Sequence, residues 1–339
     1  MKYIYWFLAI ILSSCTSPDF YVCAPDDNNL LTVLQQEGKT IQKYSSLEAA
    51  VGAAPHGASV LLLAEGYPDK PKQIERALVD EIKSKDLRVY AEFVTFADTV
   101  CKPITLSLER AVVVDSAFSH HLPMMELLTI NGSYVLPEKH DHTILAVAKV
   151  AGMEKAVYGL KDTPYYSLLY RYDDQILVST SALSHFADGR FSPQHNWKAV
   201  WNGILSFLAK QPITLRSWLS YVNSAYGRKD ILDSDARKHS IEKGIEWFYN
   251  GHFLVEDSWK KDWVDNNNGG DGTPLTSPLP RTAKDGDGSL GVIQGHCSSI
   301  YWDGSQQYTY WMRNDVQGES SMAFSLAGKF LNSPDYYLS

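Results

Sequence analysis

Two carboxylates near the carboxyl end of the chain have a spacing that suits acid–base chemistry. Asp315 and Glu319 are four residues apart, so they share one face if a helix begins at or before Asp315. Glycoside hydrolysis requires such a pair, because one carboxyl group donates a proton and an ionised one activates water or stabilises the transition state. Arg313 lies just upstream and is predicted to keep Asp315 ionised or to bind a sugar carboxylate. We therefore expect Asp315 and Glu319 to be catalytic.

Aromatic side chains crowd the same stretch, YWDGSQQYTYWMR, residues 301–313. Such rings offer flat faces on which the C–H surface of a sugar packs. The predicted substrate-binding residues are Tyr301, Trp302, Asp303, Trp311 and Arg313. Other acidic residues are weaker candidates for catalysis: Glu256, Asp257, Asp287 and Asp303.

The same residues fit two alternatives to hydrolysis. Asp315 can cap the helix while Glu319 pairs on the surface, in which case the rings bind a polysaccharide without cleaving it. A polysaccharide lyase is the other alternative, since its base is more often a tyrosine or a histidine, and His296 lies near Tyr301 in the sequence. These residue types are therefore compatible both with a catalytic site and with a site that only binds a glycan.

The composition of the chain limits its classes of partner. The 339 residues carry a formal net charge of -8, which gives no electrostatic reason to bind the phosphates of a nucleic acid. No nucleic-acid partner is therefore expected. Aromatic residues make up 12% of the chain, and rings of this size either pack in a core or stack on a ligand. The length predicts two domains.

Residues 1–14 have the pattern of a lipoprotein signal peptide. Lys2 is followed by YIYWFLAIIL, an apolar run too short to span a bilayer but long enough for the core of a signal peptide. It ends in LSSC, residues 12–15, which resembles the bacterial lipobox, in which the cysteine is lipidated and becomes the first mature residue. The resemblance implies a membrane anchor at Cys15, and we expect the protein at the outer membrane, facing the periplasm or the cell surface.

The remaining cysteines and the paired histidines do not predict a metal site. Three further cysteines are widely spaced and form no CxxC pair: Cys23, Cys101 and Cys297. They indicate neither a zinc site nor a disulfide framework, although their spacing is compatible with a single disulfide bond. His120 and His121 are adjacent, and adjacent side chains of an extended chain point apart. The segment DNNNGGDG, residues 265–272, lacks the full ligand ladder of a calcium loop. No metal and no cofactor are expected.

Residues 15–211 are predicted to form an α/β domain. Helical spacing of apolar residues predicts an amphipathic helix within 72–85. A later helix is indicated by a single apolar stripe: Trp197, Val200, Trp201, Ile204, Leu205 and Leu208. Runs of consecutive apolar residues predict buried strands of a mostly parallel sheet. They lie within 59–66, 87–94, 110–118 and further segments of 142–183.

The order of these elements, which finishes with QILVSTSALSHF and FSPQHNWKAVWNGILSFL, resembles a known domain. It is similar to the class I glutamine-amidotransferase-like domain, which occurs as an accessory module in carbohydrate-active proteins. Enzymes of that fold carry a nucleophilic cysteine in a tight, glycine-flanked turn after a strand. The comparable turn here, VVVDSAFSHH at 112–121, contains neither glycine nor cysteine. The resemblance therefore implies a bracing domain without amide transfer.

Residues 212–339 are predicted to be helical, with helices within 233–255 and over 316–331. Two segments, KHSIEKGIEWFYNGHFL and GDGSLGVIQGHCSSIYWDGSQQYTYWMRNDVQGESSMAFSLAG, resemble the start of the (α/α)6 barrel of six-hairpin glycosidases and related polysaccharide lyases. A closed barrel needs more helices than this segment holds, so we expect a truncated toroid. The resemblance implies a lipid-anchored glycoside hydrolase that acts on a polysaccharide or oligosaccharide, with a non-catalytic glycan-binding lipoprotein as the alternative.

Overall fold

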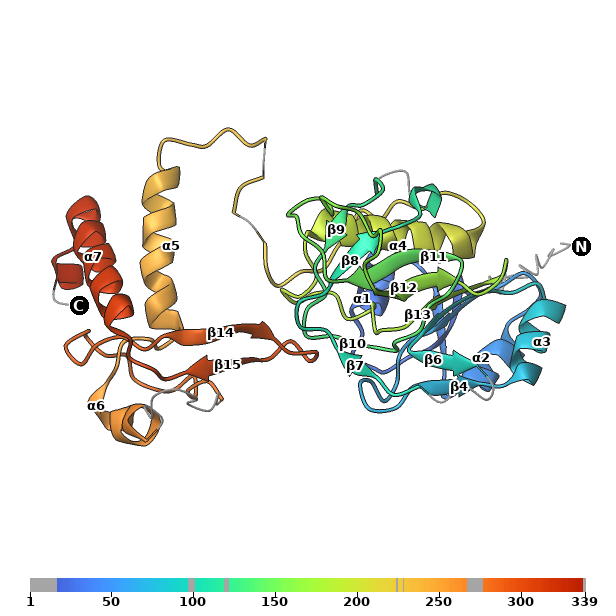
Figure 1. Ribbon diagram of the computed structural model, residues 1–339, viewed down its shortest axis with the longest axis horizontal. Helices are drawn as coiled ribbons and strands as arrows, with labels where there is room; N and C mark the ends of the chain where they lie inside the picture. The colour runs from blue at the N-terminus through green and yellow to red at the C-terminus, as the bar shows by residue number, and fades with distance from the viewer. Residues whose placement is uncertain are drawn as a thin grey trace, which may run out of the picture.

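The computed structural model describes residues 17–96, 101–118, 122–223, 225–227, 229–266 and 277–337. Figure 1 shows an amino-terminal α/β unit and a carboxyl-terminal unit, joined by a long connection that follows α4. The predicted anchor Cys15 lies outside the described residues, as do the signal peptide, His120, His121 and most of 265–272. Among the residues described, no helix is both long enough and apolar enough to cross a membrane.

A nine-stranded sheet forms the centre of the amino-terminal unit in the described part of the chain, in the order β2-β1-β3-β5-β13-β12-β11-β8-β9. Neighbouring strands are parallel from one edge to the middle: β2 (Ile41–Tyr44), β1 (Phe20–Cys23), β3 (Ser59–Leu62), β5 (Arg88–Glu92) and β13 (Ile176–Ser179). The sheet then continues with antiparallel neighbours: β12 (Tyr165–Arg171), β11 (Thr143–Ala148), β8 (Arg110–Val113) and β9 (Leu127–Leu128).

The predicted α/β architecture of this unit is confirmed, and its sheet is mixed. The strand predicted within 110–118 is β8, which pairs antiparallel with β11 rather than with a parallel neighbour. Apolar residues at successive positions indicate that both faces of a strand are buried, but they do not report its direction. Strand direction depends on the route that the intervening chain takes, and the tertiary structure decides that route.

Alternate residues of the parallel strands face opposite layers of helices. In β3, Leu61 packs in the same cluster as the apolar residues of α1 and α4, whereas Val60 and Leu62 pack with those of α2 and α3. The layers therefore cover both faces of the parallel strands, as Figure 1 shows. The helices are α1 (Asn29–Gln36), α2 (Leu47–Ala53), α3 (Arg76–Ser84) and α4 (Gln194–Ala209).

Helix α4 confirms the apolar stripe predicted from the sequence. All six residues of that stripe are buried, and the Trp201 ring meets Tyr90 of β5 edge to face at 5.2 Å. Burying two indole rings removes a large apolar area from water, which makes this helix a main source of stability for the unit. Two short strand pairs flank the sheet: β4 (Lys72–Ile74) with β6 (Val94–Phe96), and β7 (Ile104–Thr105) with β10 (Tyr134–Val135).

The carboxyl-terminal unit has its own hydrophobic cluster, which includes Phe253, Trp259, Tyr310 and Phe324. Helices α5 and α7 lie side by side on one part of this cluster (Figure 1). The elements of the unit are α5 (Ala236–Asn250), α6 (Asp257–Trp259) with the π-helical turn Lys260–Asp265, β14 (Gly295–Ile300), β15 (Gln306–Thr309), α7 (Asn314–Leu331) and the 3-10 turn Pro334–Tyr337.

A β-hairpin corrects the expectation that residues 212–339 are all helical. β14 and β15 pair antiparallel, and the turn between them contains Asp303 and Gly304, a dipeptide that favours tight hairpin turns. The helices predicted within 233–255 and over 316–331 are confirmed as α5 and α7. A partial all-α toroid is not confirmed, because the hairpin packs with these helices around one cluster.

Candidate functional site

The parallel strands place their following loops at one edge of the sheet, where open α/β sheets bind ligands. Strand β1 has β2 on one side and β3 on the other, so the chain reverses its direction of travel across the sheet at β1. At such a reversal, the loops after neighbouring strands separate and leave a crevice. Here the crevice lies between residues 24–28, which follow β1, and residues 63–67, which follow β3.

A cavity of about 510 Å³ lies at this edge of the sheet. Its wall is formed by loops of the α/β unit and by the tip of the β14–β15 hairpin, so both units contribute to it. A volume of this size is typical of sites for small molecules. The side chains that give it chemical character are Asp27, Glu65, Tyr67, His185, Asp188, Arg190, Tyr221, Trp302 and Asp303.

Arg190 is a buried cation in the cavity wall, and its side chain is only 2% exposed. Its Nε donates to Asp188 Oδ1 at 3.0 Å, and its Nη2 donates to Asp188 Oδ2 at 2.9 Å. The remaining terminal nitrogen, Nη1, donates to the hydroxyl of Ser133 at 3.1 Å. Paired and hydrogen-bonded in this way, the guanidinium is held in one orientation at a buried position.

Tyr67 forms an aromatic wall whose hydroxyl is already engaged. The hydroxyl accepts from Tyr134 N at 2.6 Å and donates to Tyr134 O at 3.2 Å. Its ring meets Phe93 edge to face at 4.9 Å and Trp302 of the hairpin tip at 5.7 Å. The Tyr67 ring therefore offers an apolar surface to the cavity and supports the indole from the other unit.

The hairpin tip lies close against the backbone of the α/β unit. A Cβ atom at Gly132, where φ is +75°, would lie 2.0 Å from the carbonyl oxygen of Ile300. Only glycine permits this approach and adopts this backbone angle without strain. The contact places Trp302 and Asp303 at the cavity, with Trp302 still 36% exposed.

Asp303 is an ionised group at the cavity mouth. Its Oδ1 accepts from the hydroxyl of Ser305 at 2.7 Å and from Ser305 N at 3.0 Å. These hydrogen bonds, the hydroxyl first, lower the pKa of Asp303, and the nearby charge of Arg190 acts in the same direction. The carboxylate is therefore available as a hydrogen-bond acceptor at neutral pH.

Hydrogen bonds join the loops of the α/β unit that surround the cavity. Asn29 Oδ1 accepts from Ala187 N at 3.0 Å, and Ala187 O accepts from Tyr221 N at 2.7 Å. His185 lies on the same loop as Ala187, and burial lowers its pKa, so the imidazole is neutral near pH 7. A neutral imidazole both donates and accepts a hydrogen bond.

A buried carboxyl group lies beneath this edge of the sheet, at the end of β5. Glu92 is 1% exposed and accepts from Tyr90 Oη at 2.9 Å and from Ser184 Oγ at 2.6 Å. Burial raises the pKa of Glu92 to about 7, although these hydrogen bonds oppose the shift. Ala64 N also donates to Glu92, and Ala64 lines the cavity. Glu92 is thus a positioning group rather than part of the wall.

The turn after β5, in the parallel part of the sheet, has an unusual backbone conformation. Phe93 follows β5 with φ +51°, in the left-handed region that non-glycine residues rarely adopt. The amidotransferase-like comparison instead placed the nucleophile turn at 112–121, but β8 in that segment lies in the antiparallel part of the sheet. The chain has Glu92 and Phe93 at the turn after β5, and neither is a cysteine nucleophile.

The predicted site residues are divided between the two ends of the hairpin. Trp302 and Asp303 line the cavity, whereas Trp311 pairs through its backbone with Gln294 at the opposite end. At about 3.3 Å per residue, the strand from Gln306 to Trp311 separates these ends by about 17 Å. Tyr301 lies at the tip, where its hydroxyl donates to Gln307 at 2.9 Å. The structure therefore brings only part of the predicted set together.

Asp315 and Glu319 lie on the exposed first turns of α7, away from the cavity wall. Arg313 forms an ion pair with Asp315 and lowers its pKa, as predicted from the sequence. Both carboxylates are exposed. Their one-turn spacing on α7 follows from the confirmed helix, and their catalytic role stays a prediction.

The weaker candidates lie in local turns of the carboxyl-terminal unit. Glu256 accepts from Ser258 N at 2.8 Å, and Asp287 accepts from Ser289 N at 2.9 Å. His296, the alternative base, faces the hydroxyl of Tyr308 at 3.3 Å rather than Tyr301. Asp257 belongs to the short helix α6. None of these four residues lines the cavity at the sheet edge.

Sequence reasoning missed the cavity residues of the α/β unit, although a signal for them exists. Glu65 lies at the end of the segment 59–66 predicted as a strand, and Tyr67 follows it. His185, Asp188 and Arg190 follow the last predicted strand within 142–183. Polar residues just beyond the carboxyl ends of parallel strands are candidates for a shared site. Which loops meet, however, depends on the strand order.

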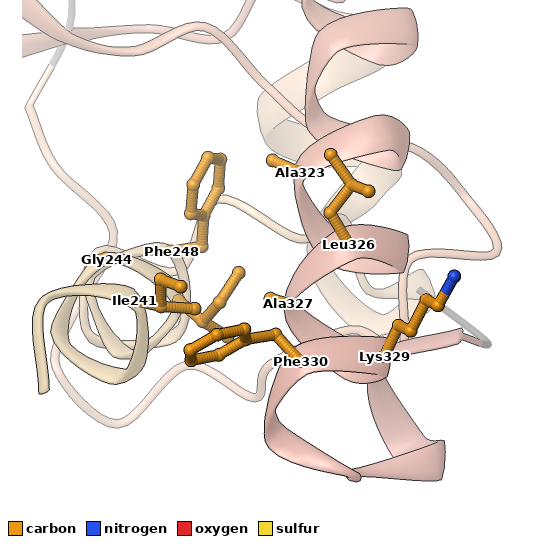
Figure 2. A pocket seen from close by; sticks show the side chains of 9 residues that line it. Ile241, Gly244, Phe248, Ala323, Leu326, Ala327, Lys329 and Phe330 are labelled. Atoms are coloured by element: carbon orange, nitrogen blue, oxygen red, sulfur yellow. The ribbon is translucent and has the colours of Figure 1, made fainter. Parts of the chain in front are cut away.

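A second cavity, of about 790 Å³, is an open apolar groove between α5 and α7. Figure 2 shows Ile241 and Phe248 of α5 facing Ala327 and Phe330 of α7. Its lining is almost entirely hydrocarbon, and Phe330 is 51% exposed. The groove lacks the converging polar groups that fix the orientation of a polar small molecule.

Comparison of the chain with known protein families, with curated proteins and with solved structures finds no match. The proposed function therefore rests on the geometry of the cavity and on the chemistry of its side chains.

Proposed function

We propose that the protein binds carbohydrate in the cavity between the sheet edge and the hairpin tip. The observation that supports this best is the partly exposed ring of Trp302 beside Asp303 and the Asp188–Arg190 pair. A sugar has an apolar C–H face and hydroxyl groups that both donate and accept hydrogen bonds. The C–H face packs on an aromatic ring, and the hydroxyl groups form hydrogen bonds with ionised side chains held in fixed orientations.

The cellular setting is part of the proposal. A lipid on Cys15 would hold the protein to the outer membrane, facing the periplasm or the cell surface, where polysaccharides are encountered. In this proposal the α/β unit serves as the amidotransferase-like accessory module that the sequence resembles. The two long helices α5 and α7 are the part of the chain that a helical toroid of the six-hairpin type would include.

Replacing Trp302 by alanine tests the binding function. Loss of a central aromatic contact costs about 2 kcal/mol, so affinity for a bound glycan should fall roughly 30-fold. The measurement is affinity electrophoresis of the full chain against a panel of polysaccharides, followed by calorimetric titration with the best ligand.

Trp311→Ala is the matched control, because it removes the same ring from the other end of the same hairpin. Affinity should stay within about twofold of the parent, since truncation of a residue outside a contact is nearly neutral. Equal losses in the two variants would place the ligand elsewhere on the hairpin. Absence of retardation with every polysaccharide would overturn the binding function.

Glycoside hydrolysis is the second candidate function, and one observation favours it. The Arg313–Asp315 ion pair holds Asp315 ionised, as a nucleophile or general base requires, and Glu319 follows one helical turn later. The pair lies on an exposed surface, so a polysaccharide would have to extend from the cavity along the hairpin to reach it.

Asp315→Asn and Glu319→Gln separate hydrolysis from binding. If these residues catalyse, each variant should release reducing ends at least about 100-fold more slowly, which is the scale of general acid–base catalysis. Affinity at the cavity should stay unchanged, because neither residue lines it. Undiminished release in both variants would remove them from the mechanism, and no release by the parent chain would favour binding alone.

A further inference from the structure

The cavity that we propose as the carbohydrate site has an excess of negative charge. Four carboxylates lie on its wall together with a single guanidinium, that of Arg190. Asp188 forms an ion pair with Arg190, which also lies on the wall, and Glu65 forms an ion pair with Lys72, which lies just outside it. These two pairs fix the positions of their side chains and contribute little net field.

Asp27 and Asp303 carry the remaining charge. In the part of the chain that the structure describes, neither forms an ion pair with lysine or arginine, although Arg190 acts on Asp303 at longer range. His185 does not compensate them, because burial lowers its pKa and keeps its ring neutral near pH 7. The two carboxylates approach from different units, one after β1 and one at the hairpin tip.

We propose that this cavity selects saccharides that carry a protonated amine, the unacetylated amino sugars, over neutral sugars, and that it rejects uronates and sugar phosphates. An ammonium group on the sugar would meet Asp303 or Asp27, while the C–H face of the same ring packs on Trp302. An anionic sugar would meet two like charges and one guanidinium already engaged by Asp188.

This inference rests on the proposed binding function and deepens it. Neutral oligosaccharides remain ligands in this account, because Trp302 and the hydroxyl-binding groups do not need a charge on the sugar. The preference among sugars comes only from Asp27 and Asp303. Charge selection and carbohydrate binding can therefore fail separately.

The test is calorimetric titration of the full chain with three oligosaccharides of equal length: glucosamine oligomers, N-acetylglucosamine oligomers and galacturonate oligomers. The glucosamine oligomer should bind roughly fivefold more tightly than its acetylated form, which corresponds to one partly exposed ion pair. The advantage should disappear at about 1 M salt, where charges are screened within about 3 Å. Galacturonate oligomers should bind most weakly.

Asp303→Asn combined with Asp27→Asn should remove the advantage of the glucosamine oligomer, so that in this variant the glucosamine oligomer and its acetylated form bind with affinities equal to within about twofold. Asp287→Asn is the matched control, because Asp287 accepts from Ser289 N in the same kind of turn, at 2.9 Å, but lies outside the cavity. That control should keep the full preference. Because only surface carboxylates change, both variants are expected to fold as the parent does.

Each outcome decides between the two proposals. Equal binding of the acetylated and unacetylated oligomers, or galacturonate binding as tightly as either, would overturn the charge selection and leave carbohydrate binding in place. A preference that survives Asp303→Asn and Asp27→Asn together would also overturn it. If none of the three oligomers binds and no polysaccharide retards the protein, carbohydrate binding fails, and the charge selection fails with it.

Discussion

Replacing Glu92 by glutamine changes the free energy of unfolding by an amount that depends on pH. The change is expected to favour the folded state by about 3 kcal/mol more at pH 8 than at pH 4. The folded protein raises the pKa of Glu92 from 4.5 to about 7 because the carboxyl group is buried. Between pH 4.5 and about 7, the carboxyl group of Glu92 is deprotonated in the unfolded chain but still protonated in the folded protein. The stability that the neutral form provides is complete below about pH 4.5 and is lost as the pH rises through about 7.

Glutamine has no proton to lose, so this part of the pH dependence should be absent in the variant. The measurement is urea denaturation of both proteins at intervals from pH 4 to pH 8, with tryptophan fluorescence as the signal. Glu242→Gln, on the partly exposed surface of α5, is the control and should change stability by less than about 0.5 kcal/mol at every pH. Parallel stability curves for Glu92→Gln and the parent would contradict a raised pKa at this position.

Replacing Asp188 by asparagine is expected to cost about 3 kcal/mol of folding stability. Arg190 is the reason, because its side chain is 2% exposed and both oxygens of Asp188 accept from it. Asparagine can present only one oxygen, and its amide group turns a donor toward the guanidinium. The variant would leave a buried cation without its counter-charge.

A second substitution tests this explanation rather than the size of the effect alone. In Asp188→Asn/Arg190→Met the buried cation is gone, so the double variant should be more stable than Asp188→Asn by at least about 1 kcal/mol. Chemical denaturation of the parent, both single variants and the double variant gives the complete cycle. Additive losses would show that the two residues act independently and that the pair is not what holds this wall of the cavity.

The cavity is formed by both units, and this has a consequence for any binding experiment. The walls after β1, β3 and β13 come from the α/β unit, whereas Trp302 and Asp303 come from a hairpin more than a hundred residues later in the chain. A ligand that contacts both sides stabilises their association, since binding favours the arrangement that it recognises. Binding experiments therefore require the full chain.

Several elements of the fold follow from the sequence because their signals are local. The stripe on α4 repeats at helical spacing over several turns, and Asn332, which adopts the left-handed conformation with φ +54°, ends α7 where the helix was predicted to stop. The buried strands β3 and β5 have apolar centres, at 60–62 and 89–91. Such patterns depend on residues close in sequence, and a single chain contains all the information needed to recognise them.

The sequence by itself determined the class of the amino-terminal unit, its main helices and strands, and the richness of aromatic and acidic groups in residues 301–319. Only the tertiary structure decided that β8, β9, β11 and β12 run antiparallel and that residues 295–309 form a hairpin. It also decided that the Trp302 ring meets the Tyr67 ring and lines the same cavity as Arg190, while Asp315 lies outside that cavity. The physical reason is that these contacts join segments far apart in sequence, so packing selects them, whereas local periodicity reports only which faces are buried.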